Sequence, residues 1–371
     1  MLSVRNTAFP RGWATAAALP KTAPWKATCT SWAAATPPWR PKTPSPWRPT
    51  LFRSIRRIHG RVIGDGQGYE GNLEHPSWSY DDTGTYYGAG ANALSFYANA
   101  IDLDVRAGAE AGAPVEVRQT YPETPWMHTG NLSFTGPAGS GNSLYLYTTD
   151  LAPYAELRGS FALDRKPKTE HFANKFGALT CAFYFWKNLT ATGWEVTGGY
   201  ADVDRGGYIR GADFVPQEKA AVPRMLGSTE SAPLRRIVRG TLVRSDNFYA
   251  EALYRRMGES ASGVALPDSC RSAVAQVLEG LGLPSGGLHQ VDGSGLSRMN
   301  SVSPEWMVSY LEAMRRSPAF EAFLEGMPRP GEGTLRVLLP NYAGRQRIVL
   351  KSGSMEGVLC YAGYLLDREG R

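Results

Sequence analysis

A change in hydrophobic period near residue 226 constrains the fold of this chain most. Before it, short runs alternate between apolar and polar residues, as in Ile101-Asp102-Leu103-Asp104-Val105, which is typical of half-buried strands. After it, apolar residues recur with helical spacing. Helices are predicted over 234–242, 248–257, 270–282 and 304–316, with Gly258 expected to end the second one. A predicted hairpin, with strands 347–351 and 358–366, closes the chain.

Charge and cysteine usage exclude several classes of protein. The formal net charge is +6, but the basic residues are scattered, so no nucleic acid partner is expected. We find no apolar run long enough for a transmembrane segment, and the patch 14–19 is too short for a signal peptide. The four cysteines and five histidines show no metal-ligand spacing. We therefore expect free thiols, no metal and no cofactor.

Residues 1–51 differ from the rest of the chain. They hold five of the ten tryptophans, and no Asp or Glu occurs before Asp65. No period of 2.0 or 3.6 residues is visible in this segment. Such a composition resembles neither a packed core nor an ordinary disordered tail.

Two short motifs carry candidate chemistry. Ser245-Asp246-Asn247 interrupts two predicted helices, where it either caps a helix or directs a serine and an asparagine into one cleft. Lys351-Ser352-Gly353-Ser354 ends a β-branched apolar strand. It is either an ordinary turn or a binding edge. In the second case Lys351 would attract a carboxylate, and Gly353 would let a peptide lie flat against the backbone.

The order of these motifs resembles the class C, low-molecular-mass penicillin-binding proteins, which are D-alanyl-D-alanine carboxypeptidases and endopeptidases. The block 244–253 resembles the second motif of that family, and Lys351-Ser352-Gly353-Ser354 resembles its third. The stretch 86–96 resembles a segment that precedes the inserted domains of the family. Asp292-Gly293-Ser294-Gly295 lies in another shared block and is predicted to form a tight turn. The resemblance covers about residues 52–371.

This resemblance implies an α+β fold, with helices on an antiparallel sheet, as in penicillin-binding proteins and β-lactamases. Residues 52–225 would be inserted β-rich domains, and 226–371 the C-terminal part of the peptidase domain. The implied substrates are peptidoglycan stem peptides ending in D-Ala-D-Ala, the implied inhibitors are β-lactams, and the implied location is periplasmic or extracytoplasmic. The implied catalytic residues are Ser245, Asn247 and Lys351, and the implied substrate-binding residues are Ser352, Gly353 and Ser354.

The nucleophile of the family lies in a Ser-x-x-Lys motif, and the 371 residues contain none. Two interpretations follow from the resemblance. The first is a serine-type D-Ala-D-Ala carboxypeptidase or endopeptidase whose nucleophile is missing from this chain. The second is a catalytically dead fragment, or a pseudoenzyme that binds muropeptides. A β-rich binding module that carries the motifs by chance is the third alternative.

The unusual N-terminal segment has its own hypothesis. Read one frame over, the codons for residues 25–40 permit the peptide EGDLYIVGGGDPTLA, which resembles the block before the family's inserted domains. Residues 1–51 would then be an out-of-frame, non-native translation of a class C gene. The C-terminus is also interpreted as truncated, and the nucleotide sequence tests both ideas.

Overall fold

The fold is that of a computed structural model, which describes residues 57–69, 71–203, 231–263, 265–284 and 286–369. Short strand segments outside these ranges are described by their backbone alone. The chain divides into two compact units, with the boundary between Glu230 and Ser231. Most of residues 1–51, including Cys29, lies outside the described residues, so the frameshift hypothesis stays a prediction. In that segment, β1 (Leu2–Arg5) pairs antiparallel with β2 (Arg11–Ala16), which also pairs with β17 (Pro223–Thr229).

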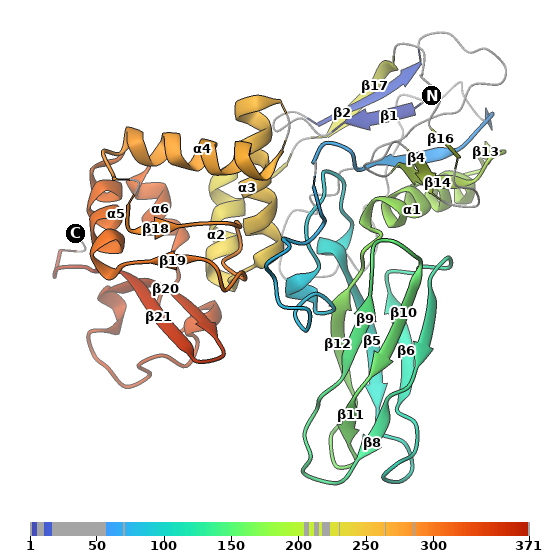
Figure 1. The fold of residues 1–371 in the computed structure, drawn as a ribbon, viewed down its shortest axis with the longest axis horizontal. Helices are drawn as coiled ribbons and strands as arrows, with labels where there is room; N and C mark the ends of the chain where they lie inside the picture. Colours follow the sequence, from blue (N-terminus) through green and yellow to red (C-terminus); the bar gives the residue numbers. More distant parts are fainter. Residues whose placement is uncertain are drawn as a thin grey trace. The chain divides into compact units, whose positions relative to one another are not determined.

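The first unit contains a region of short, paired strands (Figure 1). One sheet has the order β12-β5-β6, a second has the order β7-β10-β9, and β11 pairs with β8. Ile101, Leu103 and Val105 point into the core, as their alternation predicts, together with Leu146, Leu157 and Phe161. The strands are β5 (Ala100–Arg106), β6 (Glu116–Tyr121), β7 (His128–Asn131), β8 (Phe134–Gly136), β9 (Tyr145–Thr148), β10 (Tyr154–Arg158), β11 (Ser160–Ala162) and β12 (Lys168–Ala173).

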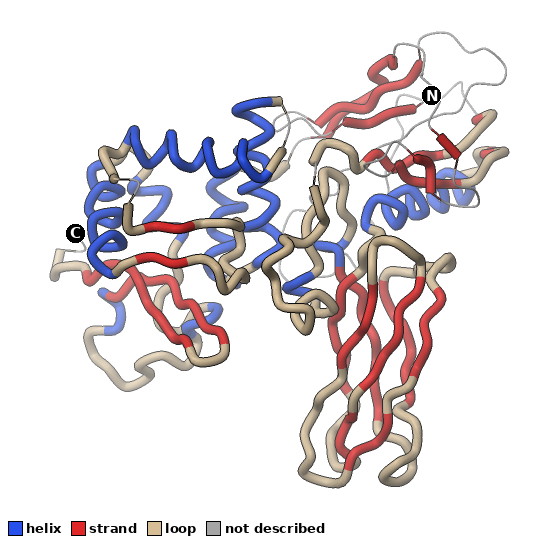
Figure 2. Tube along the Cα trace, in the orientation of Figure 1, coloured by secondary structure: helices blue, strands red, loops and turns tan. Residues whose placement is uncertain are grey.

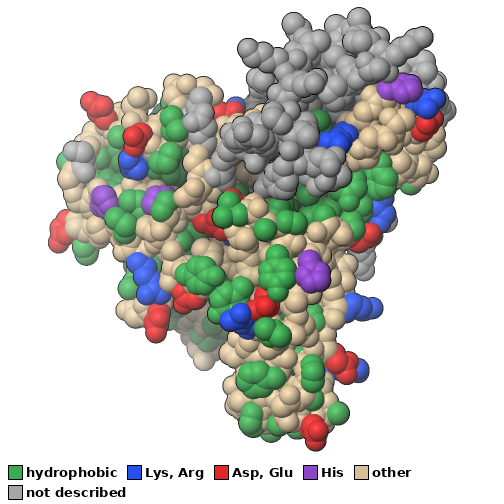
Figure 3. Space-filling model, turned by 45° about the vertical axis from the view of Figure 1, so that its right-hand side comes forward, with side chains coloured by type: hydrophobic (Ala, Val, Ile, Leu, Met, Phe, Trp, Pro, Cys, Tyr) green, Lys and Arg blue, Asp and Glu red, His purple; other side chains and the backbone are tan. Residues whose placement is uncertain are grey.

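Apolar side chains also reach the surface of this β-rich region, where Figure 3 shows them scattered between polar ones. Leu132, Phe134 and Tyr154 are among the exposed ones. Isolated apolar residues of this kind are normal on protein surfaces and indicate no binding partner.

The helix α1 (Gly177–Ala191), which the sequence analysis missed, packs against the strands Val62–Asp65 and Tyr200–Val203 of the first unit. The sequence analysis predicted β-rich structure for residues 52–225 and identified no helix there, so α1 adds an element that was not predicted. Ala178, Cys181, Ala182 and Leu189 are all buried, and Thr180 is buried with them, so no polar stripe marks the helical period. The remaining elements are β3 (Arg57–Ile58), β4 (Val62–Asp65), η1 (Tyr86–Gly88), η2 (Tyr97–Asn99), β13 (Glu195–Val196), β14 (Tyr200–Val203), β15 (Tyr208–Arg210) and β16 (Val215–Pro216).

The second unit contains the predicted helices and the closing hairpin, and also a short helix over Phe320–Gly326 that was not predicted (Figure 2). The prediction that Gly258 ends a helix is wrong, because α3 continues through it to Ser262. The helices are α2 (Leu234–Arg244), α3 (Asn247–Ser262), α4 (Pro267–Gly280), α5 (Pro304–Arg316) and α6 (Phe320–Gly326). The strands and short turns are β18 (Leu288–His289), β19 (Ser301–Val302), η3 (Gly333–Leu335), η4 (Arg345–Arg347), β20 (Ile348–Met355) and β21 (Val358–Leu365).

The hairpin β20–β21 is held against the helices by one apolar cluster. Val349 is fully buried with Met327 and Leu366, and Leu242 and Phe323 pack around them. The Tyr364 hydroxyl donates a hydrogen bond to the Leu311 carbonyl at 2.8 Å, which ties β21 to α5. The helices and the antiparallel hairpin confirm the predicted α+β class. In the part of the chain that the structure describes, no helix has the length and apolar character needed to span a bilayer.

Candidate functional site

Ser245 and Asp246 lie in the sharp connection between α2 and α3, and each has a separate role. Ser245 ends α2 in the left-handed conformation, with φ 55° and ψ 52°. Asp246 caps α3, because its side chain accepts a hydrogen bond from the Tyr249 N–H at 3.2 Å. The capping alternative therefore holds for Asp246, and Ser245 keeps its hydroxyl exposed for another contact.

That other contact is with Lys351, 106 residues further along the chain. The Lys351 Nζ donates a hydrogen bond to the Ser245 Oγ at 2.7 Å. It also donates to the Ser352 carbonyl. Lys351 reaches Ser245 from β20, whose position is set by the burial of Val349 in the same strand. The second and third motifs therefore meet within the second unit.

Thr334 is a further polar residue beside this pair, and the sequence analysis did not identify it. Its Oγ1 lies 2.7 Å from the Ser352 Oγ. The preceding Gly333 has φ +46°, and an added Cβ there would lie 1.8 Å from the Val243 carbonyl oxygen near the end of α2. This close approach brings η3 against the helix that ends at Ser245. The only local signal in the sequence is Gly333, because glycine adopts a positive φ without strain.

The other predicted site residues lie next to these. Asn247 is half-buried and begins α3, two residues after Ser245. Gly353 is opposite Cys360 in the hairpin, and an added Cβ would lie 2.8 Å from the Cys360 Sγ. Ser354 is exposed and pairs with Leu359. The missing side chain of Gly353 thus makes room for the Cys360 thiol beside the strand.

Burial changes the proton affinity of two groups in this region. Burial lowers the pKa of Lys351, and the neighbouring Cys360 opposes this shift. Burial raises the pKa of Asp246, and this is opposed by the Tyr249 N–H and by Arg244, whose Nη2 lies 3.7 Å from the carboxylate. An ammonium with a lowered pKa gives up its proton more easily, so Lys351 and Ser245 form a pair suited to proton exchange.

The block 292–297 is structural, as its turn prediction indicates. Asp292 is 1% exposed, and it accepts hydrogen bonds from the N–H groups of Gly295 and Ser297, each at 2.9 Å. The Gly293 N–H donates to Glu251 of α3 at 2.8 Å. Asp292 thus organises its own turn, and Gly293 attaches that turn to α3.

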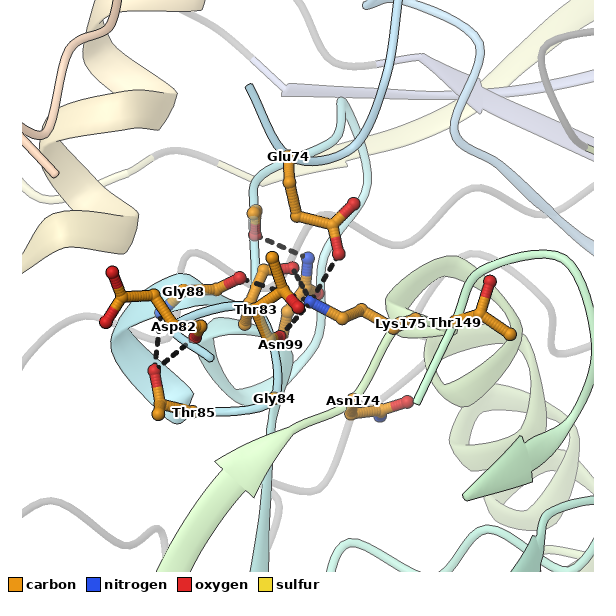
Figure 4. Close-up of polar contacts among 12 residues, drawn as sticks. Glu74, Asp82, Thr83, Gly84, Thr85, Gly88, Asn99, Thr149, Asn174 and Lys175 are labelled. Atoms are coloured by element: carbon orange, nitrogen blue, oxygen red, sulfur yellow. Dashed lines mark hydrogen bonds and ion pairs between the residues drawn. The ribbon is translucent and has the colours of Figure 1, made fainter. Parts of the chain in front are cut away.

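The first unit contains a buried lysine that sequence reasoning missed. Lys175 has a side chain with 0% exposure and forms an ion pair with Glu74 at 2.6 Å. Its Nζ also donates to the carbonyls of Thr83 at 2.5 Å and Gly88 at 3.1 Å (Figure 4). Burial lowers the pKa of Lys175, while Glu74 opposes that shift. The ammonium group thus directs its N–H donors to Glu74 and to the carbonyls of the segment 83–89, which it holds in place.

The fold has the arrangement of penicillin-binding proteins. It matches the crystal structure of penicillin binding protein 4 (dacB) from Haemophilus influenzae with a TM-score of 0.75 at 19% identity, covering 100% of this chain and 77% of that chain. A model of the D-Ala-D-Ala carboxypeptidase 3 (S13) family matches residues 52–371, and the chain belongs to this family. The resemblance to class C penicillin-binding proteins is therefore confirmed.

Individual relatives agree with this assignment. The D-alanyl-D-alanine carboxypeptidase of Actinomadura sp. (strain R39) is 28% identical over 328 residues, which are 85% of this chain and 59% of that protein. The D-alanyl-D-alanine carboxypeptidase DacB of Haemophilus influenzae is 23% identical over 338 residues, or 86% of this chain and 64% of that protein. The chain thus spans about three fifths of the length of these relatives.

Proposed function

We propose that this chain carries the substrate-binding and proton-relay part of a serine-type D-Ala-D-Ala carboxypeptidase site. The observation that carries the proposal is the 2.7 Å hydrogen bond between Lys351 and Ser245, residues from two motifs that resemble those of the family. Residues 226–371 would be the C-terminal part of the peptidase domain, and 52–225 would be domains inserted before it.

Each polar group has a role in binding a peptide that ends in D-Ala-D-Ala. Lys351 and Ser352 would bind the terminal carboxylate, because an ammonium and a hydroxyl both donate to it. Asn247 would hydrogen-bond the substrate amide, and Gly353 would let the peptide lie flat against the backbone. Ser245 would pass a proton from Lys351 to the departing amine, since its hydroxyl can accept one proton while donating another. The Ser354 N–H would supply one donor to the oxyanion.

Hydrolysis through an acyl-enzyme also needs an activated serine. Because the 371 residues contain no Ser-x-x-Lys, we propose that they bind the peptide without turning it over. The intact family reaction would take its nucleophile from sequence that is not among these residues. The alternative, that another residue of this chain acts as nucleophile, predicts a covalent adduct with penicillin.

The biological setting is proposed from the relatives. A related crystal structure of the Haemophilus influenzae protein is described as a complex with a β-lactam. A carboxypeptidase of this family would act on peptidoglycan stem peptides, so we propose a periplasmic or extracytoplasmic location.

Calorimetric titration with an N-acylated Lys-D-Ala-D-Ala peptide tests the proposal. We expect reversible binding by the whole chain and a loss of about tenfold or more in Lys351→Ala, the magnitude of one charge-assisted contact. Lys168→Ala is the matched control, because Lys168 is exposed in β12 of the other unit. Equal affinity in both variants would refute the assigned site.

Labelling with fluorescent penicillin tests whether this chain has a nucleophile. A stable covalent adduct on this chain would contradict binding without turnover.

A further inference from the structure

The connection between α6 and β20 presents apolar side chains to solvent. In the segment 336–345, here called the apolar loop, Val337 is 77% exposed, Tyr342 49% and Leu339 42%. Figure 2 draws this connection as a long loop flanked by two short helical turns, η3 and η4. A valine that is three-quarters exposed protrudes from the surface, so it is available to whatever this loop contacts.

The apolar loop is built from ordered turns. The Leu338 N–H donates to the Leu335 carbonyl at 3.0 Å, and the Tyr342 N–H donates to the Leu339 carbonyl at 3.2 Å. The Arg345 side chain donates to the Pro340 carbonyl at 2.9 Å. Leu339 has φ +49°, a left-handed conformation that is unfavourable for leucine. The structure therefore holds a strained leucine with its side chain partly in water.

Along the sequence, the charged residues from the apolar loop to the end of β20 are all positive. From Gly333 to Met355 the sequence has no Asp or Glu, and it has three arginines, Arg336, Arg345 and Arg347, besides Lys351 of the candidate site. The nearest preceding acid, Glu332, already accepts hydrogen bonds from Arg239 and from the Arg329 N–H, each at 3.1 Å. Arg336 is itself exposed and follows directly on η3. The loop thus combines a protruding apolar tip with a positive flank.

We propose that the apolar loop inserts into the surface of a membrane that contains anionic phospholipids. Short apolar side chains can enter the boundary between headgroups and acyl chains, and a tyrosine is suited to the headgroup level. Arginines beside such a tip are attracted to the negative headgroups, and their aliphatic stems can lie along the apolar boundary. A flat protein partner fits less well, because stable protein interfaces need a broad complementary face and not a few protruding side chains.

This contact is independent of the proposed peptidase function. Thr334, which lies 2.7 Å from Ser352, comes two residues before the apolar loop. Membrane binding would therefore hold the Ser245–Lys351 pair of the same unit close to the lipid surface. The binding itself requires only the loop and its charges, and it is measured without any peptide substrate.

Flotation of the whole chain with vesicles tests the proposal. Binding is expected to vesicles of equal parts phosphatidylglycerol and phosphatidylcholine at low salt, and not to phosphatidylcholine alone. The variant Val337→Ser/Leu339→Asn removes the apolar tip, and asparagine tolerates the left-handed conformation at 339. We expect it to bind about tenfold more weakly, whereas Arg336→Gln should weaken binding and reduce its salt dependence.

Val308→Ser is the matched control, because Val308 is 58% exposed on α5. It should bind like the unchanged chain. Absence of binding to the anionic vesicles would overturn the proposal, and so would equal loss in the control and in the double variant. Light scattering tests the alternative that the apolar loop contacts a second copy of the chain. If the unchanged chain is a dimer that does not bind vesicles, and Val337→Ser/Leu339→Asn converts it to a monomer, the membrane assignment is overturned.

Discussion

At the scale of single residues, Lys351 brings the candidate site together. It donates to Ser245 and to the Ser352 carbonyl, and burial lowers its pKa. A lysine that is less basic than usual can bind a carboxylate while protonated and then release that proton to its partner. The same property makes its charge depend on pH in a range where an ordinary lysine remains charged.

The first prediction concerns the pH dependence of peptide binding. Affinity for the D-Ala-D-Ala peptide should fall as pH rises toward the lowered pKa of Lys351, because the neutral amine no longer attracts the carboxylate. Lys351→Arg should bind about tenfold more weakly at neutral pH, since guanidinium is larger and shaped differently, but with little pH dependence. Titration calorimetry across the alkaline range measures both. The same pH profile for both proteins would contradict the assignment.

The free energy of unfolding should also depend on pH through Lys351. The folded state holds the Lys351 proton less tightly than the unfolded chain does. Between the lowered pKa and the ordinary lysine value, the unfolded chain therefore binds more protons, and this residue's contribution to folding stability rises with pH.

At the scale of elements, the close approach of α3 and α4 explains why a glycine lies inside a helix. An added Cβ at Gly258 would lie 2.5 Å from the Cys270 Sγ and 2.8 Å from the Cys270 backbone nitrogen. Cys270 itself is buried in the first turn of α4. The glycine is thus needed for packing between two helices, and a sequence pattern cannot distinguish that need from a helix end.

The second prediction is that Gly258→Ala destabilises the protein, although alanine is the better helix former. Overpacking should cost about 1–3 kcal/mol. Gly280→Ala in the last turn of α4 is the matched control, because its added Cβ has no neighbour within 4 Å. That change should be neutral or stabilising by up to about 1 kcal/mol. Urea unfolding measures both, and equal effects would contradict the packing argument.

At the scale of the whole molecule, the two units have separate cores. The core of the β-rich region contains Ile101, Leu103 and Phe161, and the hairpin core of the second unit contains Val349 and Met327. Each unit also has its own buried polar contacts. The first unit has Lys175 with Glu74, and the second has Asp292 in its turn and the buried Glu251–Arg255 pair at 3.3 Å.

The third prediction is that Lys175→Met destabilises the first unit by about 3 kcal/mol, because the carbonyls of the segment 83–89 and the Glu74 carboxylate lose their donor. Lys168→Met is the matched control, since Lys168 is solvent-exposed in β12 and should change stability by less than about 0.5 kcal/mol. Urea unfolding measures the loss of stability, and amide hydrogen exchange should show that the loss of protection lies in the first unit. Peptide binding by the second unit should persist, and a uniform loss of protection in both units would contradict separate cores.

The sequence determined those features whose signals are local. The amphipathic stretches of α2, α4 and α5 and the apolar strands of the hairpin were predictable, because residues a few positions apart form each periodic pattern. The helix α1 was not predictable in this way, because it is buried over most of its first turns and lacks a polar stripe. The motif order pointed to Ser245 and Lys351, and the family assignment followed from it.

Only the tertiary structure decided which distant groups meet. Ser245 and Lys351 are 106 residues apart, and Lys175 meets carbonyls 86 to 92 residues before it. Thr334 joins Ser352 through a turn that depends on the contact of Gly333 with α2. Such contacts result from the burial of apolar faces against one another, which no local period encodes. The change of period near residue 226 thus predicted α2, α3, α4, α5 and the closing hairpin, and the packing of α2 against η3 and β20 brings the candidate site residues together.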